Sequence, residues 1–240
     1  MLLRVGKDAR PWTNRIISRG SVVGDPPVFD AEVFPWAKRL EDGWREVRHE
    51  VDALMRFRDR LPAFKEISPD QARIARDRAW KSYFLFGFGR RQELACRRCP
   101  RTAELVESIP GLESAMFSVM EPGAVLARHR GPTKAIITCH LGLIVPTERE
   151  RCWIKIDKKR YVWEEGKTLI FDDTYPHKMR NETSEPRVVL LLHARRPTRG
   201  AATLVARGFL GAIKWSPYVR DARRRQDEFA RAFELGAGEA

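Results

Sequence analysis

Hydrophobic residues recur with a helical period in the first half of the chain. From Pro35 onward, apolar positions follow one another at steps of three and four, and charged residues fill the positions between them. The apolar face of this predicted helix consists of Leu40, Trp44, Val47, Val51 and Leu54. Pro62 ends the pattern. A serine–proline pair then predicts a second helix over 69–79, and Pro100 predicts a short third one.

From Met116 onward the chain consists of short apolar runs separated by turn residues. The runs that we expect to form strands are 117–120, 135–141, 153–156, 167–171 and 188–193. Short strands at even spacing with turns between them are typical of a β-sandwich or barrel. Helices that come first and strands that follow them indicate an α+β fold. Helical character returns after Pro197.

These patterns divide the chain into three parts. We expect an irregular N-terminal segment over 1–33 and one domain over 34–197. Within that domain, helices are expected in 35–110 and a β-barrel core in 116–195. A basic helical extension is expected over 198–240. A length of 240 residues with 43% hydrophobic residues suffices for one domain with a substantial core.

The chain carries a formal net charge of +13, with arginine and lysine concentrated between 195 and 225. A surplus of this size attracts anionic partners such as nucleic acid, lipid headgroups or acidic substrates. Few aromatic residues in this stretch could stack on bases, so we expect no specific nucleic-acid partner. No apolar run has the length of a signal peptide or a membrane span. We therefore expect a cytoplasmic protein, whose basic C-terminal region offers a peripheral contact with an anionic membrane.

Histidines are the first candidates for metal chemistry. The five in the chain are His49, His129, His140, His177 and His193. His129 and His177 each stand beside a predicted strand end, where they could meet across the mouth of a barrel. A histidine beside a strand is more often a core or surface residue than a ligand. The residues around it decide between these interpretations.

Short motifs around these histidines occur in a characteristic order. The first segment contains Phe117-Ser118, Pro122-Gly123, His129-x-Gly131-Pro132-Thr133 and His140-Leu141-Gly142-Leu143-x-x-Pro146. The second contains Trp163-Glu164-x-Gly166-Lys167, Phe171-Asp172-Asp173, His177 and Arg187. Trp80 and Cys96-x-x-Cys99-Pro100-x-Thr102 precede both. In this order and spacing, the set resembles the aspartyl/asparaginyl β-hydroxylase family over residues 34–197.

The resemblance implies a double-stranded β-helix, a cupin-like jelly roll, with N-terminal helices packed on it and a C-terminal helical extension. It also implies an Fe(II)/2-oxoglutarate-dependent dioxygenase in which His129 and His177 bind the iron. Most such enzymes add a carboxylate two residues after the first histidine, where this chain has Gly131. The family that this chain resembles also has glycine at the position of Gly131, and water completes the metal shell. We interpret Asp172 and Asp173 as strand-end residues that orient His177.

The same resemblance assigns residues to 2-oxoglutarate, which is used together with O2. Arg187 would bind its distal carboxylate, which suits a planar bidentate donor in a pocket of low dielectric. Ser118 would assist at that carboxylate, His140 would lie near the metal-bound end, and Trp80 would line the pocket. For these last three residues, the alternatives of a strand serine, a core histidine and a core tryptophan stay open.

Three residues suggest a substrate without an acidic group. Met116 and Thr138 stand where the peptide hydroxylases resembled here have basic residues, and Ile136 lies two positions before Thr138. A strand period of two would point all three into the site. An unpaired carboxylate there would be costly. We therefore expect hydroxylation of an unactivated C–H bond in a neutral or apolar substrate, such as a lipid acyl chain or a small amino-acid-derived molecule.

Two other functions stay open at this point. One is a peptidyl aspartyl/asparaginyl β-hydroxylase. The other is a non-catalytic cupin-like binding protein. Thr138 in place of a basic residue favours this function, and the presence of both histidines and Arg187 argues against it.

Overall fold

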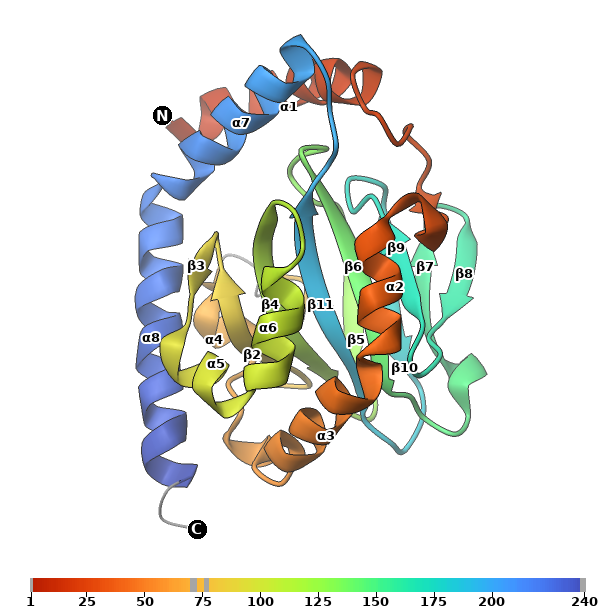
Figure 1. Ribbon diagram of the computed structural model, residues 1–240, viewed down its shortest axis with the longest axis vertical. Helices are drawn as coiled ribbons and strands as arrows, with labels where there is room; N and C mark the ends of the chain where they lie inside the picture. The colour runs from red at the N-terminus through yellow and green to blue at the C-terminus, as the bar shows by residue number, and fades with distance from the viewer. Residues whose placement is uncertain (1, 70–72, 76–77, 238–240) are drawn as a thin grey trace.

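Two antiparallel β-sheets face each other in the computed structural model, which describes residues 2–69, 73–75 and 78–237 (Figure 1). The strands are β1 Val28–Phe29, β2 Trp80–Gly87, β3 Arg90–Arg91, β4 Leu112–Met120, β5 Val125–His129, β6 Ile136–Ile144, β7 Cys152–Ile156, β8 Lys159–Val162, β9 Thr168–Phe171, β10 His177–Asn181 and β11 Arg187–Arg195. The larger sheet has seven strands in the order β1-β9-β6-β11-β4-β2-β3. The smaller has four in the order β5-β10-β7-β8.

Helices cover the outer face of the larger sheet and one end of the molecule (Figure 1). The α-helices are α1 Leu2–Arg19, α2 Pro35–Asp42, α3 Trp44–Met55, α4 Phe64–Ile67, α5 Glu93–Arg98, α6 Pro100–Glu107, α7 Ala201–Lys214 and α8 Pro217–Ala237. The 3-10 helices are η1 Ala31–Val33, η2 Arg58–Arg60 and η4 Arg149–Arg151. The fold is the predicted α+β arrangement, a cupin-like jelly roll with helices packed on it.

Strand β11 lies between β6 and β4 in the middle of the larger sheet and is buried on both faces. Leu190 and Leu192 belong to the core on the helix side of the sheet. Val189 and Leu191 belong to the core between the two sheets. Because both faces are covered, the strand is one apolar run in the sequence rather than an alternation of apolar and polar residues.

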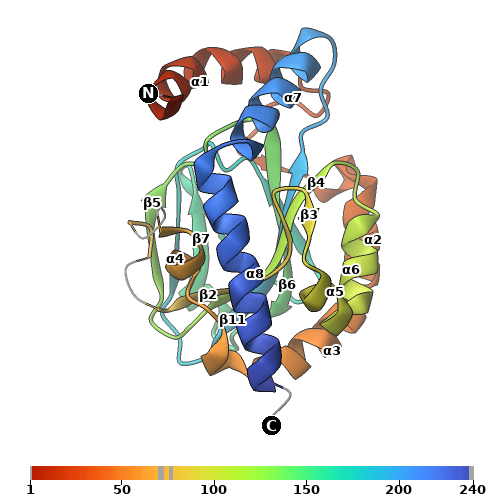
Figure 2. The same ribbon diagram turned by 90° about the vertical axis from the view of Figure 1, so that its left-hand side faces the viewer.

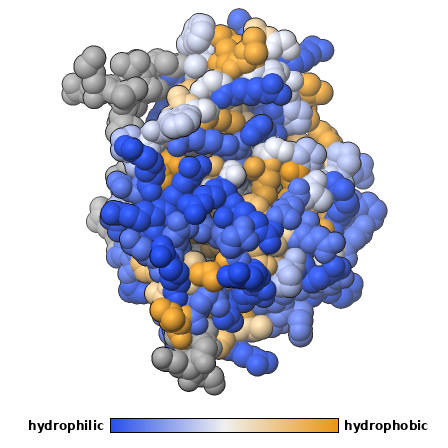
Figure 3. Space-filling view, turned by 60° about the vertical axis from the view of Figure 1, so that its left-hand side comes forward, coloured by the Kyte–Doolittle hydropathy of each residue, from blue (hydrophilic) through white to orange (hydrophobic). Residues whose placement is uncertain are grey.

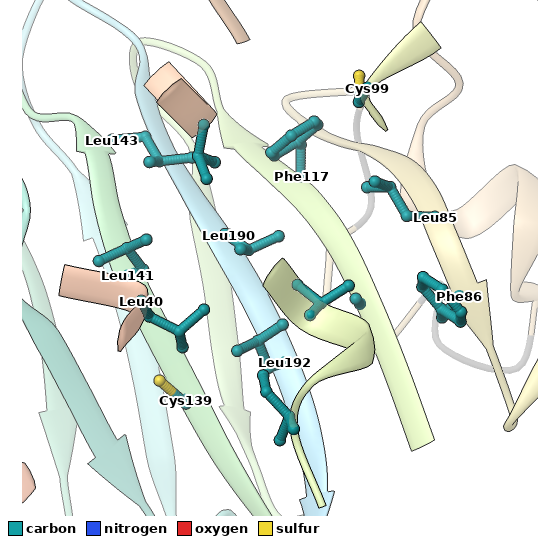
Figure 4. Packing of buried hydrophobic residues seen from close by; sticks show 14 of the residues in the cluster. Leu40, Leu85, Phe86, Cys99, Phe117, Cys139, Leu141, Leu143, Leu190 and Leu192 are labelled. Carbon is teal, nitrogen blue, oxygen red and sulfur yellow. The ribbon is translucent and has the colours of Figure 1, made fainter. Parts of the chain in front are cut away.

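The core on the helix side is built by the apolar face predicted after Pro35. Leu40 of α2 lies in the same cluster as Leu141 of β6 and Leu190 of β11 (Figure 4). The predicted single helix is divided into α2 and α3 at Gly43, but its apolar positions are buried as expected, with Trp44 partly buried. The periodic pattern therefore located this layer correctly.

The N-terminal segment differs from the prediction. Residues 1–33 were expected to be irregular, yet α1 occupies most of this stretch and packs against α7. Pro11 lies inside α1, and Thr13 and Ile17 are its only buried residues between positions 10 and 19. A proline inside a segment argues against a helix when only the sequence is considered. The helix is stabilised by its contact with α7, which no local pattern reveals.

The stretch expected to be helical over 35–110 also contains strands. Strand β2 pairs with β4, and most of its side chains are buried on both faces, so it shows no alternation that would identify a strand. The helix predicted for 69–79 is wrong where the structure describes that stretch: Ile74 and Ala75 are buried in non-helical backbone. Positions 70–72 and 76–77 lie outside the described residues.

The C-terminal extension is helical, as predicted. Helix α8 packs against α4, α5 and β2, and α7 continues from its upper end toward α1 (Figure 2). Arg98 of α5 donates two hydrogen bonds of 2.7 Å to Glu234 of α8. The extension is therefore an integral part of the domain.

A buried ion-pair network fixes the chain segments at one end of the sheets. The side chains of Arg196 and Asp172 are both fully buried and form an ion pair. Lys134 Nζ lies 2.7 Å from the same Asp172 carboxylate and 2.6 Å from Asp25. Arg196 Nε also donates to the Lys134 carbonyl oxygen at 2.8 Å. Segments before β6, after β9, after β11 and before β1 are thereby held together.

Asp172→Asn is expected to destabilise the fold, because it removes the fully buried carboxylate beside Arg196 and leaves that charge only the more distant Asp25, at 3.4 Å. The loss should be about 3–5 kcal/mol in the free energy of unfolding, measured by urea denaturation. Asp42→Asn is the matched control, since Asp42 pairs with Lys38 on the exposed surface, and it should leave stability almost unchanged. Equal stability of the two variants would show that the network does not support the fold.

Candidate active site

His129 and His177 lie side by side at one end of the smaller sheet. His129 is the last residue of β5, His177 is the first of β10, and the two are directly opposite each other in the antiparallel ladder. Their ring centres are 4.1 Å apart. The structure thus brings together the two histidines that the sequence singled out as metal ligands.

Each of these rings is oriented by a backbone carbonyl two residues earlier. His129 Nδ1 lies 2.8 Å from the Ala127 oxygen, and His177 Nδ1 lies 3.0 Å from the Tyr175 oxygen. A carbonyl only accepts hydrogen bonds, so Nδ1 carries the proton and Nε2 keeps its lone pair. Burial lowers the pKa of His129, and burial lowers that of His177 to about 4. Both rings are neutral at pH 7, which is the form that binds metals.

Of the two aspartates predicted to orient His177, Asp173 contributes through its backbone, together with the Tyr175 carbonyl. The Asp172 carboxylate makes its hydrogen bonds elsewhere. Asp172 accepts hydrogen bonds from the backbone and hydroxyl of Thr174, at 2.9 and 2.6 Å, and pairs with Arg196. It therefore shapes the loop that leads to His177. The side chain of Asp173 makes no such contacts, and its Oδ1 is buried without a partner.

The Asp173 carboxylate lies where a side chain at position 131 would have to be. A Cβ built on Gly131 would come within 2.0 Å of Asp173 Oδ1, and the Gly131 N–H donates to the Asp173 carbonyl at 2.7 Å. Burial and the neighbouring Asp172 raise the pKa of Asp173 to about 7. Glycine at 131 is thus required by this close packing beside His129.

The protein offers two side-chain ligands at this position. In the part of the chain that the structure describes, no three His, Cys, Asp or Glu side chains gather in a way that could hold a metal ion. A metal bound by His129 and His177 would therefore keep most of its coordination positions for other ligands.

Arg187 lies at the other end of the inner face, as the first residue of β11. It is buried, its guanidinium carbon lies 4.4 Å from the centre of the Trp163 ring, and its Nη1 donates to the Ser118 carbonyl at 3.2 Å. Its Nε is buried without a partner, and no acidic side chain of the described residues pairs with it. Burial lowers its pKa to about 10, so it is charged at pH 7. A buried cation of this kind suits an anionic ligand.

His140 lies between Arg187 and the histidine pair. Trp163 Nε1 donates to His140 Nδ1 at 3.2 Å, so the His140 proton is on Nε2, and that atom is buried without a partner. Burial and the charge of Arg187 lower the pKa of His140 well below its usual value. The Phe171 ring then lies 5.1 Å from His140 and 5.7 Å from His177, between ring centres. His140 is therefore a neutral, unused donor on the same inner face.

Ser118 and Trp80 are joined by a hydrogen bond. Trp80 Nε1 donates to Ser118 Oγ at 3.0 Å, which leaves the hydroxyl proton of Ser118 free to donate elsewhere. Both residues are buried, and Trp80 stacks on Phe64 with 3.9 Å between ring centres. Since Ser118 also supplies the carbonyl for Arg187, these two side chains border the region around the guanidinium.

The three residues expected to contact substrate are not equivalent. Met116 lies in the core between the sheets, and Thr138 is buried there with its Oγ1 unpaired. Ile136 differs from the expectation, because it is partly buried and packs on the cluster that contains Ile17 and Leu210. Ile136 is the first residue of β6, paired with Arg195 of β11, at the end of the sheet that the helices cover. Thr138 and Met116 therefore define the inner surface, and Ile136 supports α1 and α7.

His193 is a site residue that the sequence interpretation missed. The strand register places it between Ser114 of β4 and Thr138 of β6, and Thr138 is paired in turn with Phe171. Burial lowers its pKa to about 4, so it is neutral at pH 7. The alternation of side chains along a strand would have identified it. His193 lies six residues, an even number, after Arg187 on one strand and therefore on the same face.

Comparison with known proteins agrees with this geometry. The family model described as aspartyl/asparaginyl beta-hydroxylase matches residues 41–197, which include every site residue named above. An ornithine lipid ester-linked acyl 2-hydroxylase of Rhizobium tropici is 36% identical over 222 residues, which cover 92% of this chain and 79% of that protein. The human aspartyl/asparaginyl beta-hydroxylase is 32% identical over 165 residues, covering 67% of this chain.

These matches differ in extent. The matched part is 21% of the human aspartyl/asparaginyl beta-hydroxylase, so this chain spans about a fifth of that protein. A Pseudomonas putida prolyl-4-hydroxylase structure covers 65% of this chain and 88% of its own, at 20% identity and a TM-score of 0.40, a likeness too distant to add to the argument. The family model and the relatives that match most of the chain suffice: the chain belongs to the aspartyl/asparaginyl β-hydroxylase family.

Proposed function

We propose that this chain is a 2-oxoglutarate-dependent hydroxylase that holds iron(II) with His129 and His177 and acts on the acyl chain of a lipid ester. The observation that carries the proposal is Arg187, a buried cation without an acidic partner. It lies on the same inner face as His140, which connects it to the histidine pair through Phe171.

The residues at the mouth fit iron(II). Two neutral imidazoles present their Nε2 lone pairs, and backbone carbonyls fix the orientation of both rings. With iron(II), 2-oxoglutarate and O2 bound, the site would couple decarboxylation of the keto acid to hydroxylation of a C–H bond. The small number of protein ligands leaves room for a chelating cosubstrate.

The buried donors fit a dicarboxylate such as 2-oxoglutarate. Arg187 would hold the distal carboxylate, with the free hydroxyl proton of Ser118 as a further donor. His140 Nε2–H would donate to the carboxylate at the other end, because it has no partner of its own. Neutral His140 also avoids adding a second buried charge next to Arg187.

The inner face near the histidine pair supports a neutral substrate. Thr138, His193 and Met116 carry no charge at pH 7, so a carboxylate bound there would lack a counter-ion. Thr138 and His193 offer hydroxyl and N–H groups that suit a carbonyl oxygen. The Rhizobium tropici relative is named for hydroxylation at position 2 of an ester-linked acyl group, which is the carbon next to the ester carbonyl.

The surface beside His177 has the opposite character. A hollow of 280 Å³ there is lined by three cations and one carboxylate, Arg128, Lys155, Lys178 and Asp157, together with Pro176 and His177. Cations at the surface and neutral groups inside suit an amphiphile, whose polar headgroup stays outside while its acyl chain enters. This difference in polarity favours a lipid over a small acidic amino acid.

Turnover tests the proposal directly. Iron-loaded protein supplied with 2-oxoglutarate and an ester-linked acyl lipid should form succinate and a lipid heavier by one oxygen atom, both measured by mass spectrometry. His177→Ala should abolish both products, because one imidazole does not hold the metal. His49→Ala, on the exposed surface of α3, is the matched control and should retain both. Equal succinate formation in the two variants would contradict the metal assignment.

Arg187→Met should weaken 2-oxoglutarate binding on the order of a hundredfold, because a hydrogen bond to a charged group contributes about 1.5–3 kcal/mol. Calorimetric titration of the metal-loaded protein without oxygen measures this. Ser118→Ala should cause a smaller loss. Arg180→Met, an exposed arginine of β10, is the control and should bind normally. Normal affinity in Arg187→Met would exclude its role in binding the cosubstrate.

Thr138→Arg should change the substrate preference, because it places a cation among the neutral groups of the inner face. Turnover of the acyl ester should fall, while acidic analogues should bind more tightly in competition assays. Thr138→Val retains the shape without the charge and controls for packing. His193→Leu should raise KM for the ester more than it lowers kcat if its N–H binds the carbonyl. Unchanged preference in Thr138→Arg would place the substrate elsewhere.

A further inference from the structure

Helices α1 and α7 pack against each other at one end of the molecule (Figure 1). A small cluster of Ile17, Ala206 and Leu210 joins them to Ala135 beside β6. The side chain of Asn14 in α1 accepts a hydrogen bond of 2.9 Å from the Lys134 N–H. Lys134 is in the loop that follows His129, so the helix pair is attached to the end of the sheets that carries the two histidines.

Both helices of this pair expose large apolar side chains. Trp12 of α1, Leu204 of α7 and Trp215 at the end of α7 are 63%, 73% and 86% exposed. Leu204, Gly208, Gly211 and Trp215 recur at steps of three and four, so they share one face of the helix. A Cβ at either glycine would meet no atom within 4 Å, so this face is uncovered in the part of the chain that the structure describes.

The two helical segments are basic in sequence, and Lys214 at the end of α7 is neutralised by the buried Glu113 at 2.8 Å. Neither 10–20 nor 197–220 contains an aspartate or glutamate. Arg15 and Arg207 are exposed, and none of the described acidic side chains lies within ion-pair distance of them. Figure 3 shows hydrophobic side chains among strongly hydrophilic ones at this end of the molecule.

We propose that the α1–α7 pair docks on the surface of an anionic phospholipid bilayer. Trp12, Leu204 and Trp215 enter the interface between headgroups and acyl chains, and the arginines beside them contact the headgroups. Tryptophan suits this boundary, because its ring is apolar and its N–H remains hydrogen-bonded. No helix in the described residues has the length and apolar character to span a bilayer, so the contact is interfacial.

Charge and polarity together select this partner. A second copy of the chain would bring an equally basic surface against this one, and like charges would oppose the contact. Nucleic acid would satisfy the arginines but would leave Leu204 without an apolar partner. A bilayer with anionic lipids satisfies both groups. Docking would hold the histidine end of the barrel at the membrane, within reach of an acyl chain.

Co-sedimentation with vesicles tests this contact without any turnover. The protein should bind vesicles of phosphatidylcholine mixed with phosphatidylglycerol, bind vesicles of phosphatidylcholine alone much less, and be released by high salt. Leu204→Ser combined with Trp215→Ser should weaken binding on the order of tenfold or more, because two large apolar side chains no longer enter the interface. Arg15→Glu combined with Arg207→Glu should reduce binding to the anionic vesicles in particular.

Leu235→Ser is the matched control, because Leu235 is 75% exposed near the opposite end of the molecule, in α8. It should bind vesicles as the unmodified protein does, and circular dichroism should show the same helix content in all variants. Absence of vesicle binding overturns the proposal. An equal loss of vesicle binding in Leu235→Ser, or unaffected vesicle binding in the Leu204 and Trp215 double variant, also overturns it. Salt-sensitive binding to duplex DNA without binding to vesicles would overturn it as well.

Membrane docking and the proposed reaction can fail separately. His177→Ala should still bind vesicles, because the surface is independent of the metal. If the unmodified protein turns over a detergent-dispersed lipid ester but does not bind vesicles, the docking proposal is wrong and the hydroxylase proposal stands. If the protein binds vesicles but never forms succinate, the docking proposal stands and the hydroxylase proposal is wrong.

Discussion

The alternation of side chains along β11 is the constraint on which both core and site depend. This strand lies in the middle of the larger sheet, so each of its residues must serve either the helix side or the inner side. Leu190 and Leu192 anchor the helices, while Arg187 and His193 face inward with Val189 and Leu191. A shift of the register by one residue would bury the arginine among leucines and expose the core to the inner face. One hydrogen-bonding register therefore fixes stability and chemistry together.

Two buried arginines near the ends of this strand have opposite roles. Arg196 follows the strand and pairs with Asp172 and Asp25, and backbone carbonyls and the Ser21 hydroxyl accept its remaining hydrogen bonds. Arg187 begins the strand, and the described residues that contact its guanidinium are the Ser118 carbonyl, the sulfur atoms of Met179 and Cys152, and the Trp163 ring. The protein thus neutralises one buried charge with its own carboxylate, and the other is the cation that the proposed function assigns to the cosubstrate. Pairing, more than burial, distinguishes a structural arginine from a binding one.

Much of this organisation could be predicted from the sequence, for identifiable reasons. The helical period of apolar residues located α2 and α3. The order and spacing of the motifs, through their resemblance to a known family, singled out His129, His177 and Arg187. What failed depends on packing and backbone contacts that leave no pattern in the sequence. Helix α1 requires α7, β2 is buried on both sides and shows no alternation, and the carbonyl that orients His177 is a backbone group without a sequence signal. His193 was overlooked although the alternation of side chains alone placed it correctly.

The separation of the two cores has an evolutionary consequence. The leucines that hold the helices lie on one side of the larger sheet, and Met116 and Thr138 lie on the other. Under the proposed function, exchanges at the inner positions would alter substrate preference while the leucine contacts on the helix side stay in place. Selection can therefore act on substrate choice and on stability through different residues of the same strands. A lineage built on this sheet can acquire new substrates by a few inward substitutions, while its helical layer continues unchanged.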